Sequence, residues 1–385
     1  MSGRLLRLVC TAAIAAGATL APAPSAAAAV PAPTPTPTPT ATTAPGERSV
    51  AELLTDLQRL YREAEKATET YNATEERLKR QRTEVTRLNG RLAAARSTLR
   101  DSRGAAGRLA RQQYQGTSEI SSYVRLLLAR DPQHALDQGH VIGQVSKERA
   151  GTVRRLAGSE QRTDDLARRA RTALDGRLTL AERQRKDRDL VRERLKDVEE
   201  LLASLTAEQL SRVAELERSG VAKAQDELVA SGALSSTRRP SAAGGEALRY
   251  AVGQIGKPYE WGAEGPDTYD CSGLTSRAWG SAGRPIPRTS QEQWARLPRI
   301  DLGELRPGDL VIYFPEATHV AMYLGDGMVV QAPRPGTRIK VSPVAANPVL
   351  GAVRPDPSAE PLSRYTPPRL PEAATDGSDE GYDTP

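Results

Sequence analysis

The sequence predicts two unlike parts: an all-α N-terminal region built as a long helical hairpin or coiled coil, and a compact C-terminal α+β domain. A heptad pattern of apolar residues begins at Val50, which is typical of long helices packed together. From residue 246 onward Gly and Pro become frequent, and short apolar runs replace the heptads. Aromatic residues make up only 4% of the 385 residues, so much of the chain is expected to be extended helix or linker rather than one large core.

The first residues are typical of an export signal. Arg4 and Arg7 precede an apolar run over residues 8–20, and small residues follow over 25–29. This order of positive, apolar and small residues predicts a signal peptide over residues 1–29, and hence a secreted, extracytoplasmic protein. An uncleaved membrane anchor is the alternative, although the apolar run is short for a membrane span.

The segment after the signal predicts a spacer. Residues 30–46 are rich in Pro and Thr, which favours extended polyproline II and cannot build a core. Removal of the signal would also remove Cys10 and leave Cys271 as the only cysteine. A lone cysteine is a candidate reactive thiol, although a free cysteine is often a small buried apolar residue.

Residues 47–230 carry the helical pattern. Apolar residues recur every seven positions from residue 50 to 99, and a second series offset by three residues runs beside them. A stripe of this length needs a partner helix to bury it. The helical pattern resumes over residues 145–228, which favours an antiparallel hairpin, while a parallel homodimer remains the alternative. Glycines between residues 104 and 143 predict a small helical tip.

The rest of the chain divides into three parts. Residues 231–245 are small and predict a flexible linker. Residues 246–355 predict a compact α+β domain that is large enough to fold alone. Residues 356–385, rich in Pro and then acidic, predict a disordered tail. The expected strands of the domain are Leu310 to Phe314, His319 to Leu324, Met328 to Ala332 and Arg338 to Val341.

The charge pattern excludes some classes of partner. The formal net charge is +6, and positive and negative residues are interspersed among the 26% of residues that are charged. This pattern suits a solvated helical face better than a nucleic-acid surface, although a basic balance also suits an anionic partner such as a cell wall or membrane. With one Cys and one His in the C-terminal domain, no zinc-ligand set is available, so no metal or other cofactor is expected.

Cys271 and His319 are the residues of the domain that fit nucleophilic catalysis. The residues after Cys271 have a helical pattern, which places the thiol at a helix N-terminus, where backbone N–H groups and the macrodipole favour a thiolate. His319 is the only histidine of the domain and begins an apolar strand. A thiolate with an adjacent histidine base is the arrangement of a cysteine peptidase. A structural histidine is the alternative reading.

Five ordered motifs extend this pairing over about residues 246–354. They are Gly256-Lys257-Pro258-Tyr259-Glu260-Trp261-Gly262, Tyr269-Asp270-Cys271-Ser272-Gly273-Leu274, Pro287-Arg288-Thr289-Ser290, Leu305-Arg306-Pro307-Gly308-Asp309-Leu310 and His319-Val320-Ala321-Met322-Tyr323-Leu324-Gly325. This part of the chain resembles the NlpC/P60 family of bacterial cell-wall peptidases, which has a papain-like fold.

The resemblance implies roles for individual residues. Cys271 matches the nucleophile and His319 its base. Asp270 and Ser272, which flank the nucleophile, match residues that line the substrate cleft, and Tyr259 matches a tyrosine near the oxyanion position.

The residue that orients the histidine departs from the family. The matching position holds Gln331, where the family usually has His. An amide oxygen can accept the imidazole N–H and fix its tautomer, but it supplies no charge. The expectation is therefore a working but weaker triad. Three arginines, Arg288, Arg334 and Arg338, are candidates to meet substrate carboxylates or are ordinary surface residues.

The resemblance also implies a function. Such enzymes hydrolyse peptidoglycan stem peptides, commonly between D-iso-glutamate and the diamino acid, and are associated with the cell wall. Long coils before this domain resemble those of division hydrolases, which implies that the coil restrains the domain or docks on a cell-division membrane complex of the ABC-transporter type. The alternatives are a wall-binding or regulatory coiled-coil protein with a weak or inactive peptidase domain, an acyl transferase that uses the same thioester, and a coil that is a passive spacer.

Overall fold

The computed structural model describes residues 48–115, 124, 131–234, 238–372 and 374–375. The predicted signal peptide and the Pro/Thr-rich spacer lie outside these residues. The described residues belong to one unit of the chain, which begins at Arg48. Within the described part, no helix is both long and apolar enough to cross a membrane.

The described helices fall into an N-terminal group and a domain group. The long helices are α1 (Val50–Gln115), α3 (Pro132–Ala203) and α4 (Ala207–Ala230), and the domain holds α5 (Ala242–Val252), α6 (Cys271–Ser281) and α7 (Ser290–Arg296). The strands are β1 (Arg299–Ile300), β2 (Leu310–Tyr313), β3 (His319–Gly325), β4 (Met328–Gln331), β5 (Lys340–Pro343) and β6 (Val349–Val353), and two short 3₁₀ helices are η2 (Leu302–Glu304) and η3 (Val344–Ala346).

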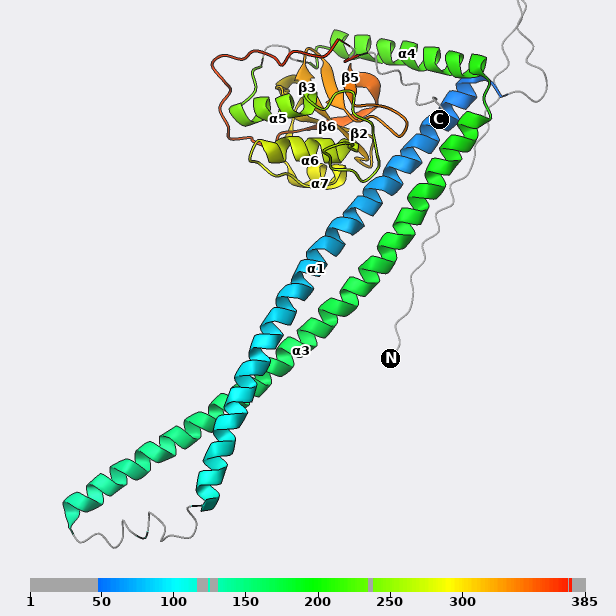
Figure 1. The fold of residues 1–385 in the computed structure, drawn as a ribbon. Coiled ribbons are helices and arrows are strands. Elements are labelled where there is room, and N and C mark those ends of the chain that lie inside the picture. The colour runs from blue at the N-terminus through cyan, green and yellow to red at the C-terminus, as the bar shows by residue number, and fades with distance from the viewer. Residues whose placement is uncertain (1–47, 116–123, 125–130, 235–237, 373, 376–385) are drawn as a thin grey trace, which may run out of the picture. The chain divides into compact units, whose positions relative to one another are not determined.

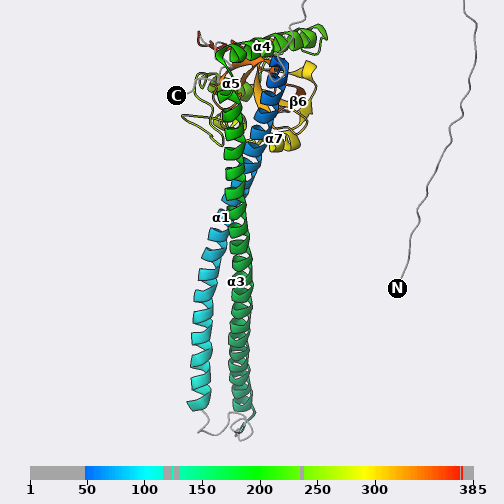
Figure 2. The same ribbon diagram turned by 90° about the vertical axis from the view of Figure 1, so that its right-hand side faces the viewer.

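The arm, defined here as α1 and α3, is an antiparallel hairpin within one chain. Both views show the two helices side by side over much of their length (Figure 1, Figure 2). Heptad residues of α1 pack against α3 in two clusters. One contains Val85, Leu88, Leu92, Leu166, Ala170 and Ala173, and the other contains Leu53, Leu57, Tyr61 and Val198 together with Val213 of α4. The prediction of a hairpin is therefore confirmed, and the stripe is buried without a second copy of the chain.

The expected tip at residues 104–143 is shorter than predicted. Gly104 and Gly107 lie inside α1, and Gly139 lies inside α3. A glycine in a helix interior costs about 1 kcal/mol relative to alanine, which a long helix tolerates because propagation adds a hydrogen bond for each residue. Only residues 116–131 separate the two helices.

The second helical segment is interrupted where the sequence predicted continuity to residue 228. The chain leaves α3 after Ala203, and α4 begins after Thr206. Thr206 and Gln209 form a reciprocal cap, in which the Gln209 N–H donates to the Thr206 hydroxyl at 3.2 Å and the Thr206 N–H donates to the Gln209 amide oxygen at 2.9 Å. The pattern Thr-x-x-Gln is a recognised helix start, so the break was detectable in the sequence.

The domain is built on one antiparallel sheet with strand order β1-β6-β2-β3-β4-β5. Helices α5 and α6 cover one face, where Leu248, Leu274 and Trp279 meet side chains from β2, β3 and β4. The opposite face packs Val311, Tyr313 and other residues beneath α4 and the segments near it, including the partly buried Leu228 and Leu234. The central strand β3 is therefore buried on both faces, as its uninterrupted apolar sequence predicts.

The sequence identified four of the six strands and missed the two nearest one edge. β1 has only two residues, and β6 follows a turn rich in Pro and Ala without alternating polarity. β6 lies between β1 and β2 and pairs Val353 with both Arg299 and Leu310. Such short segments carry little periodicity and form strands only because neighbouring strands supply their hydrogen bonds.

Two boundaries also differ from the predictions. The linker expected to reach residue 245 ends earlier, because Ser241 caps α5 through the Gly244 N–H at 2.8 Å. The tail expected to be disordered from residue 356 is ordered over its described portion. Asp356 is buried and accepts a hydrogen bond from Arg306 at 2.8 Å, and the Leu362 N–H donates to the Pro240 carbonyl at 2.8 Å. Residues 376–385 lie outside the described part.

Candidate active site

Cys271 is the first residue of α6, as the sequence predicted. Asp270 is the N-cap residue, and its carboxylate accepts the Gly273 N–H at 2.6 Å. Gly273 has no alternative here, because a Cβ at this position would lie 2.1 Å from the Ala263 carbonyl oxygen. The cap and this close approach fix the start of the helix, and the Cys271 side chain is directed into the interior with 4% exposure.

His319 and Gln331 lie on adjacent strands and form a hydrogen-bonded pair. His319 begins β3, Gln331 ends β4, and both side chains are buried. His319 Nε2 lies 2.7 Å from the Gln331 amide oxygen Oε1. Because an amide oxygen can only accept, this pair assigns the proton to Nε2 and leaves Nδ1 as the basic nitrogen. Cys271 and Val320, the residue after His319, belong to the same core cluster, and α6 packs against β3, so the predicted nucleophile and base lie on adjoining elements.

A buried ion pair lies beside the nucleophile. Arg288 donates to both carboxylate oxygens of Asp270, at 2.8 and 3.0 Å, and to the Ser272 hydroxyl at 2.9 Å. Arg288 is only 8% exposed, and Asp270 and Ser272 are fully buried. Such a bidentate pair holds its members in a fixed orientation. Of the three arginines singled out in the sequence, Arg288 is thus a buried partner of Asp270 rather than a surface residue.

Helix α1 places two further polar side chains in this cluster. The Ser272 hydroxyl donates to Glu69 Oε1 at 2.6 Å, and the Ser290 N–H donates to Glu69 Oε2 at 2.9 Å. Glu69 Oε1 also lies 3.9 Å from the Cys271 sulfur. Asn72, one turn further along α1, donates its amide to Asp270 Oδ2 at 3.0 Å. The Glu69 carboxylate of the arm therefore lies directly beside the predicted nucleophile.

A third residue of α1 reaches the base. Glu65 Oε1 lies 3.4 Å from His319 Nδ1, the nitrogen that is not bonded to Gln331. Glu65, Glu69 and Asn72 are spaced by four and three residues, so they share one face of α1. The sequence analysis assigned no site residue to the arm. The sequence carried no signal for this role, because polar residues outside the heptad stripe are typical of a solvated face, and only the structure shows that these three are buried.

These neighbours change the ionisation of Cys271 and His319, the predicted catalytic pair. Burial, followed by the carboxylates of Glu69 and Asp270, raises the pKa of the Cys271 thiol well above its usual range. Burial lowers the pKa of His319, but Glu65 and the Gln331 hydrogen bond outweigh it, so that the net pKa is raised. The helix N-terminus was expected to favour a thiolate. With α1 in place the structure differs, because the arm removes water and adds negative charge.

The surroundings of Glu69 disfavour its own negative charge. Burial and the adjacent Asp270 carboxylate raise its pKa from 4.5 to about 7, although Arg288 and the hydrogen bonds from Ser272 and Ser290 act in the opposite direction. At neutral pH the Glu69 side chain is therefore expected to be divided between its protonated and its charged form.

The remaining predicted residues are placed as follows. Tyr259 is 8% exposed, and burial followed by the nearby Cys271 and Asp270 raises the pKa of its hydroxyl well above the usual range. Tyr259 belongs to the same core cluster as Cys271, and its place near the oxyanion stays a prediction. Arg338 is exposed and donates to the Gly256 carbonyl at 2.8 Å.

Arg334 joins the domain to both α1 and α4. Its guanidinium lies 4.5 Å from the centre of the Tyr61 ring on α1 and donates to both carboxylate oxygens of Glu217 on α4, at 2.9 and 3.1 Å. Gln225 of α4 makes two further bonds, to the Gly327 carbonyl at 3.0 Å and from the Ala345 N–H at 3.0 Å. We call the group Tyr61, Glu217 and Arg334 the clasp. It lies along a groove whose lining also includes Glu65 and Gln331.

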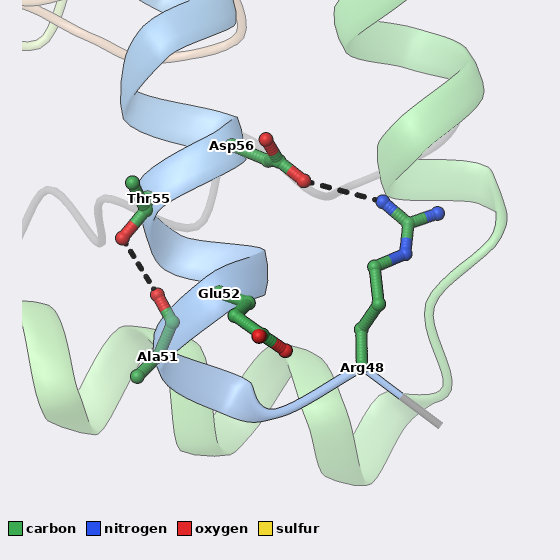
Figure 3. Close-up of a pocket in the computed structure, with 5 residues that line it drawn as sticks. All are labelled: Arg48, Ala51, Glu52, Thr55 and Asp56. Atoms are coloured by element: carbon green, nitrogen blue, oxygen red, sulfur yellow. Dashed lines mark hydrogen bonds and ion pairs between the residues drawn. The ribbon is translucent and has the colours of Figure 1, made fainter. Parts of the chain in front are cut away.

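Two other features carry no chemistry that we can assign. Glu69, Asp270 and Cys271 lie within 4.8 Å of one another, as metal ligands do, but both Asp270 oxygens already accept from Arg288, whose charge disfavours a cation. The first turns of α1 line a small surface pocket, in which Arg48 pairs with Asp56 at 3.3 Å (Figure 3). These surface contacts stabilise the start of the helix.

Comparison with known proteins matches this site to a family. The family model "NlpC/P60 family" matches residues 256–351. Residues 256–351 form an NlpC/P60 domain. The predicted resemblance and fold class are thereby confirmed. The match includes Cys271, His319 and Gln331, and it leaves out the arm and the residues that α1 contributes to the cluster.

The NlpC/P60 domain has curated relatives in other bacteria. A probable endopeptidase of Corynebacterium glutamicum (strain R) is 41% identical over 123 residues, which are 32% of this chain and 58% of that protein. A probable endopeptidase of Mycobacterium bovis is 34% identical over 120 residues, 30% of this chain and 31% of that protein. The chain thus matches 58% and 31% of the lengths of these two relatives.

Solved structures also align with the NlpC/P60 domain. The NlpC/p60 domain of the peptidoglycan hydrolase SagA is 32% identical, with 29% of this chain and 97% of that chain covered and a TM-score of 0.28. RipD of Mycobacterium tuberculosis, described as a non-catalytic NlpC/p60 domain protein adapted to peptidoglycan binding, is 28% identical, with 30% of this chain and 98% of that chain covered and a TM-score of 0.28.

Proposed function

We propose that this protein is a secreted cysteine endopeptidase that hydrolyses the stem peptides of peptidoglycan. The observation that carries the proposal is the pairing of His319 with Gln331, which leaves Nδ1 as the basic nitrogen on a strand that packs against the helix beginning at Cys271. His319 would take the thiol proton, the Cys271 sulfur would attack the scissile carbonyl, and the N–H groups at the start of α6 would stabilise the oxyanion. His319 would then protonate the leaving amine, and water would hydrolyse the thioester.

The substrate class follows from the cradle around Glu69, by which we mean the Ser272 hydroxyl and the Ser290 N–H beside Arg288. This cradle holds a carboxylate at the nucleophile. Peptidoglycan stem peptides carry free carboxylates, including that of D-iso-glutamate. We propose that the cradle takes this group when α1 is displaced and that the enzyme cuts between D-iso-glutamate and the diamino acid, as a D,L-endopeptidase.

Mass spectrometry of released muropeptides tests this function. The protein without the hairpin, residues 204–385, is incubated with purified peptidoglycan, beside its Cys271→Ala variant as the control for contaminating hydrolases. Fragments that end in D-iso-glutamate and appear only with the native cysteine support the proposal. Fragments cut at another bond would refute the D,L specificity, and the absence of any cysteine-dependent fragment would refute the hydrolase.

We also propose that the arm inhibits the enzyme. Glu69 and Asn72 occupy the cleft beside Cys271, and Glu65 lies against the basic nitrogen of His319. A substrate peptide and these side chains need the same space, so catalysis requires that α1 leave. The thiol pKa, which α1 helps to raise, adds a second block because the attacking species is the thiolate. A division role, with a membrane complex of the ABC-transporter type as the partner that moves the arm, is the setting implied by the sequence resemblance.

Arm docking is expected to weaken as pH rises from about 4.5 to about 7. Glu69 has a pKa of about 7 in the docked state against 4.5 in water, so docking takes up a proton in this window. The stabilisation is complete below the lower value and is lost as pH passes the upper one, by on the order of 3 kcal/mol. His319, whose pKa is also raised, acts in the same direction. The other groups that face Glu69 are Glu65, Asp270, Cys271 and Arg288.

The measurement is the activity of residues 48–385 divided by that of residues 204–385 at each pH, which cancels the titration of the catalytic pair in the released domain. This ratio should rise between pH 5 and 7.5. Glu69→Gln, which keeps the shape and imitates the protonated acid, should hold the ratio low and reduce its slope. A ratio that falls with pH, or an unchanged slope in the variant, would show that Glu69 does not control docking.

A second function, wall binding without catalysis, is favoured by one observation: Gln331 stands where the family usually has His. Gln331→Ala separates the two functions. If Gln331 orients a catalytic base, its removal leaves the buried His319 N–H unpaired and frees the other tautomer, which should lower kcat by about 10²-fold with little change in KM. Gln331→His should retain activity. Thermal unfolding of both variants controls for folding. Activity that is unchanged by both substitutions would argue against the triad.

A further inference from the structure

The half of the arm that lies far from the clasp is strongly basic. We define the distal arm as residues 87–115 of α1 and 132–171 of α3. It contains 15 Lys and Arg against six Asp and Glu, a net charge of +9 that exceeds the +6 of the whole chain. Its α1 segment holds seven Arg and only one acidic residue, Asp101. The basic balance of the protein is thus concentrated in one part of it.

These charges are solvent-exposed and incompletely neutralised. Elsewhere on the arm, cations pair with acids one turn away, as Arg59 does with Glu63 at 3.0 Å and Lys79 with Glu76 at 3.1 Å. On the distal part of α1, five exposed arginines form no ion pair with another described residue: Arg91, Arg96, Arg100, Arg108 and Arg111. A concentration of unpaired guanidinium groups attracts a polyanionic surface.

The same segment exposes large apolar side chains. Buried residues end at Leu92 on α1 and begin at Ser159 on α3, and Figure 1 shows the two helices diverging beyond the packed region. Beyond Leu92 and Ser159 the two helices therefore leave several large apolar side chains uncovered. The exposed ones are Tyr114 (85% exposed), Leu136 (74%), Val141 (57%), Val145 (38%) and Val153 (58%).

We propose that the distal arm binds the surface of an anionic lipid bilayer. An interfacial segment combines basic groups with exposed apolar side chains, because the cations meet lipid headgroups while the apolar groups enter the acyl boundary. A soluble anionic polymer would satisfy the arginines but not the apolar side chains. The proposal goes beyond the hydrolase function and does not depend on it.

Vesicle sedimentation tests the proposal with residues 48–385, the compact unit, because the apolar run of residues 8–20 would bind lipid by itself. Vesicles of phosphatidylcholine alone are compared with vesicles that contain about 30% phosphatidylglycerol, at roughly 50 and 500 mM salt. One variant changes the five unpaired arginines of α1 to Gln. A matched control removes five exposed cations from the proximal part of α3: Arg183, Arg185, Lys186, Arg192 and Lys196.

The expected result is binding to the anionic vesicles at low salt, loss at high salt, and affinity reduced on the order of hundredfold in the distal variant while the control binds like the parent. Helical content measured by circular dichroism confirms that each variant folds. An equal loss of vesicle binding in both variants would show that overall charge alone causes the binding, and would overturn the assignment to the distal arm. No binding to anionic vesicles at low salt would overturn the lipid proposal and assign the surface to a protein or a soluble polymer.

Discussion

Removal of the helical hairpin is expected to accelerate peptidoglycan digestion by roughly hundredfold or more, measured as residues 204–385 against residues 48–385. An enzyme whose competent state is only a small fraction of the population loses activity in proportion to that fraction. Three side chains of α1 contact Asp270, Ser272 and His319, and a docking free energy of about 3 kcal/mol would leave the cleft open about 1% of the time.

The shortened chain is chosen to keep the domain intact. It retains α4, whose Leu228 packs with the second face of the sheet, and it retains the Thr206 cap that begins this helix. Arg334→Ala in residues 48–385 supplies an independent test, since it breaks the clasp to Tyr61 and Glu217 without touching the cradle. Its activity should lie between the two. Equal rates for all three proteins would mean that the arm is a passive spacer.

Replacement of Cys271 by Ala is expected to abolish digestion by residues 204–385, with a loss of roughly 10³-fold or more. The covalent step has no other nucleophile, and the members of such a catalytic unit do not act independently. Cys271 is the free cysteine of the described chain, so alkylation reports on this position alone there. Residual activity in the alanine variant near that of the parent would refute the mechanism.

The same thiol reports the position of the arm. In residues 48–385 Cys271 is 4% exposed and the pKa of its thiol is raised by burial and by Glu69, so iodoacetamide should label it slowly at pH 7. In residues 204–385 water returns, Glu69 is absent, and the start of α6 favours the thiolate, so labelling should be at least tenfold faster. A thiol that stays inert in the released domain would instead support a wall-binding role.

The local features of the catalytic domain could be predicted from the sequence because short-range physics determines them. Asp270 before Cys271 is a helix cap, the apolar run after His319 is a buried strand, and Gln331 ends the next strand. The antiparallel pairing of β3 with β4 brings the last two side chains together at 2.7 Å. The heptads required a partner helix, and the chain supplied it in α3 because one long apolar stripe buries another.

The amino-acid sequence alone predicted the two-part architecture, the NlpC/P60 motifs and Cys271, His319 and Gln331 as nucleophile, base and orienting amide. The surroundings of these three residues depend on the tertiary fold. Glu69 and Asn72 are about two hundred positions away from Ser272 and Asp270, and no local propensity relates residues at such a separation. On α1 alone they are ordinary polar residues of a solvated face. Their burial, the raised pKa of Cys271 and the capture of a carboxylate beside it arise because folding places one face of the arm in the cleft.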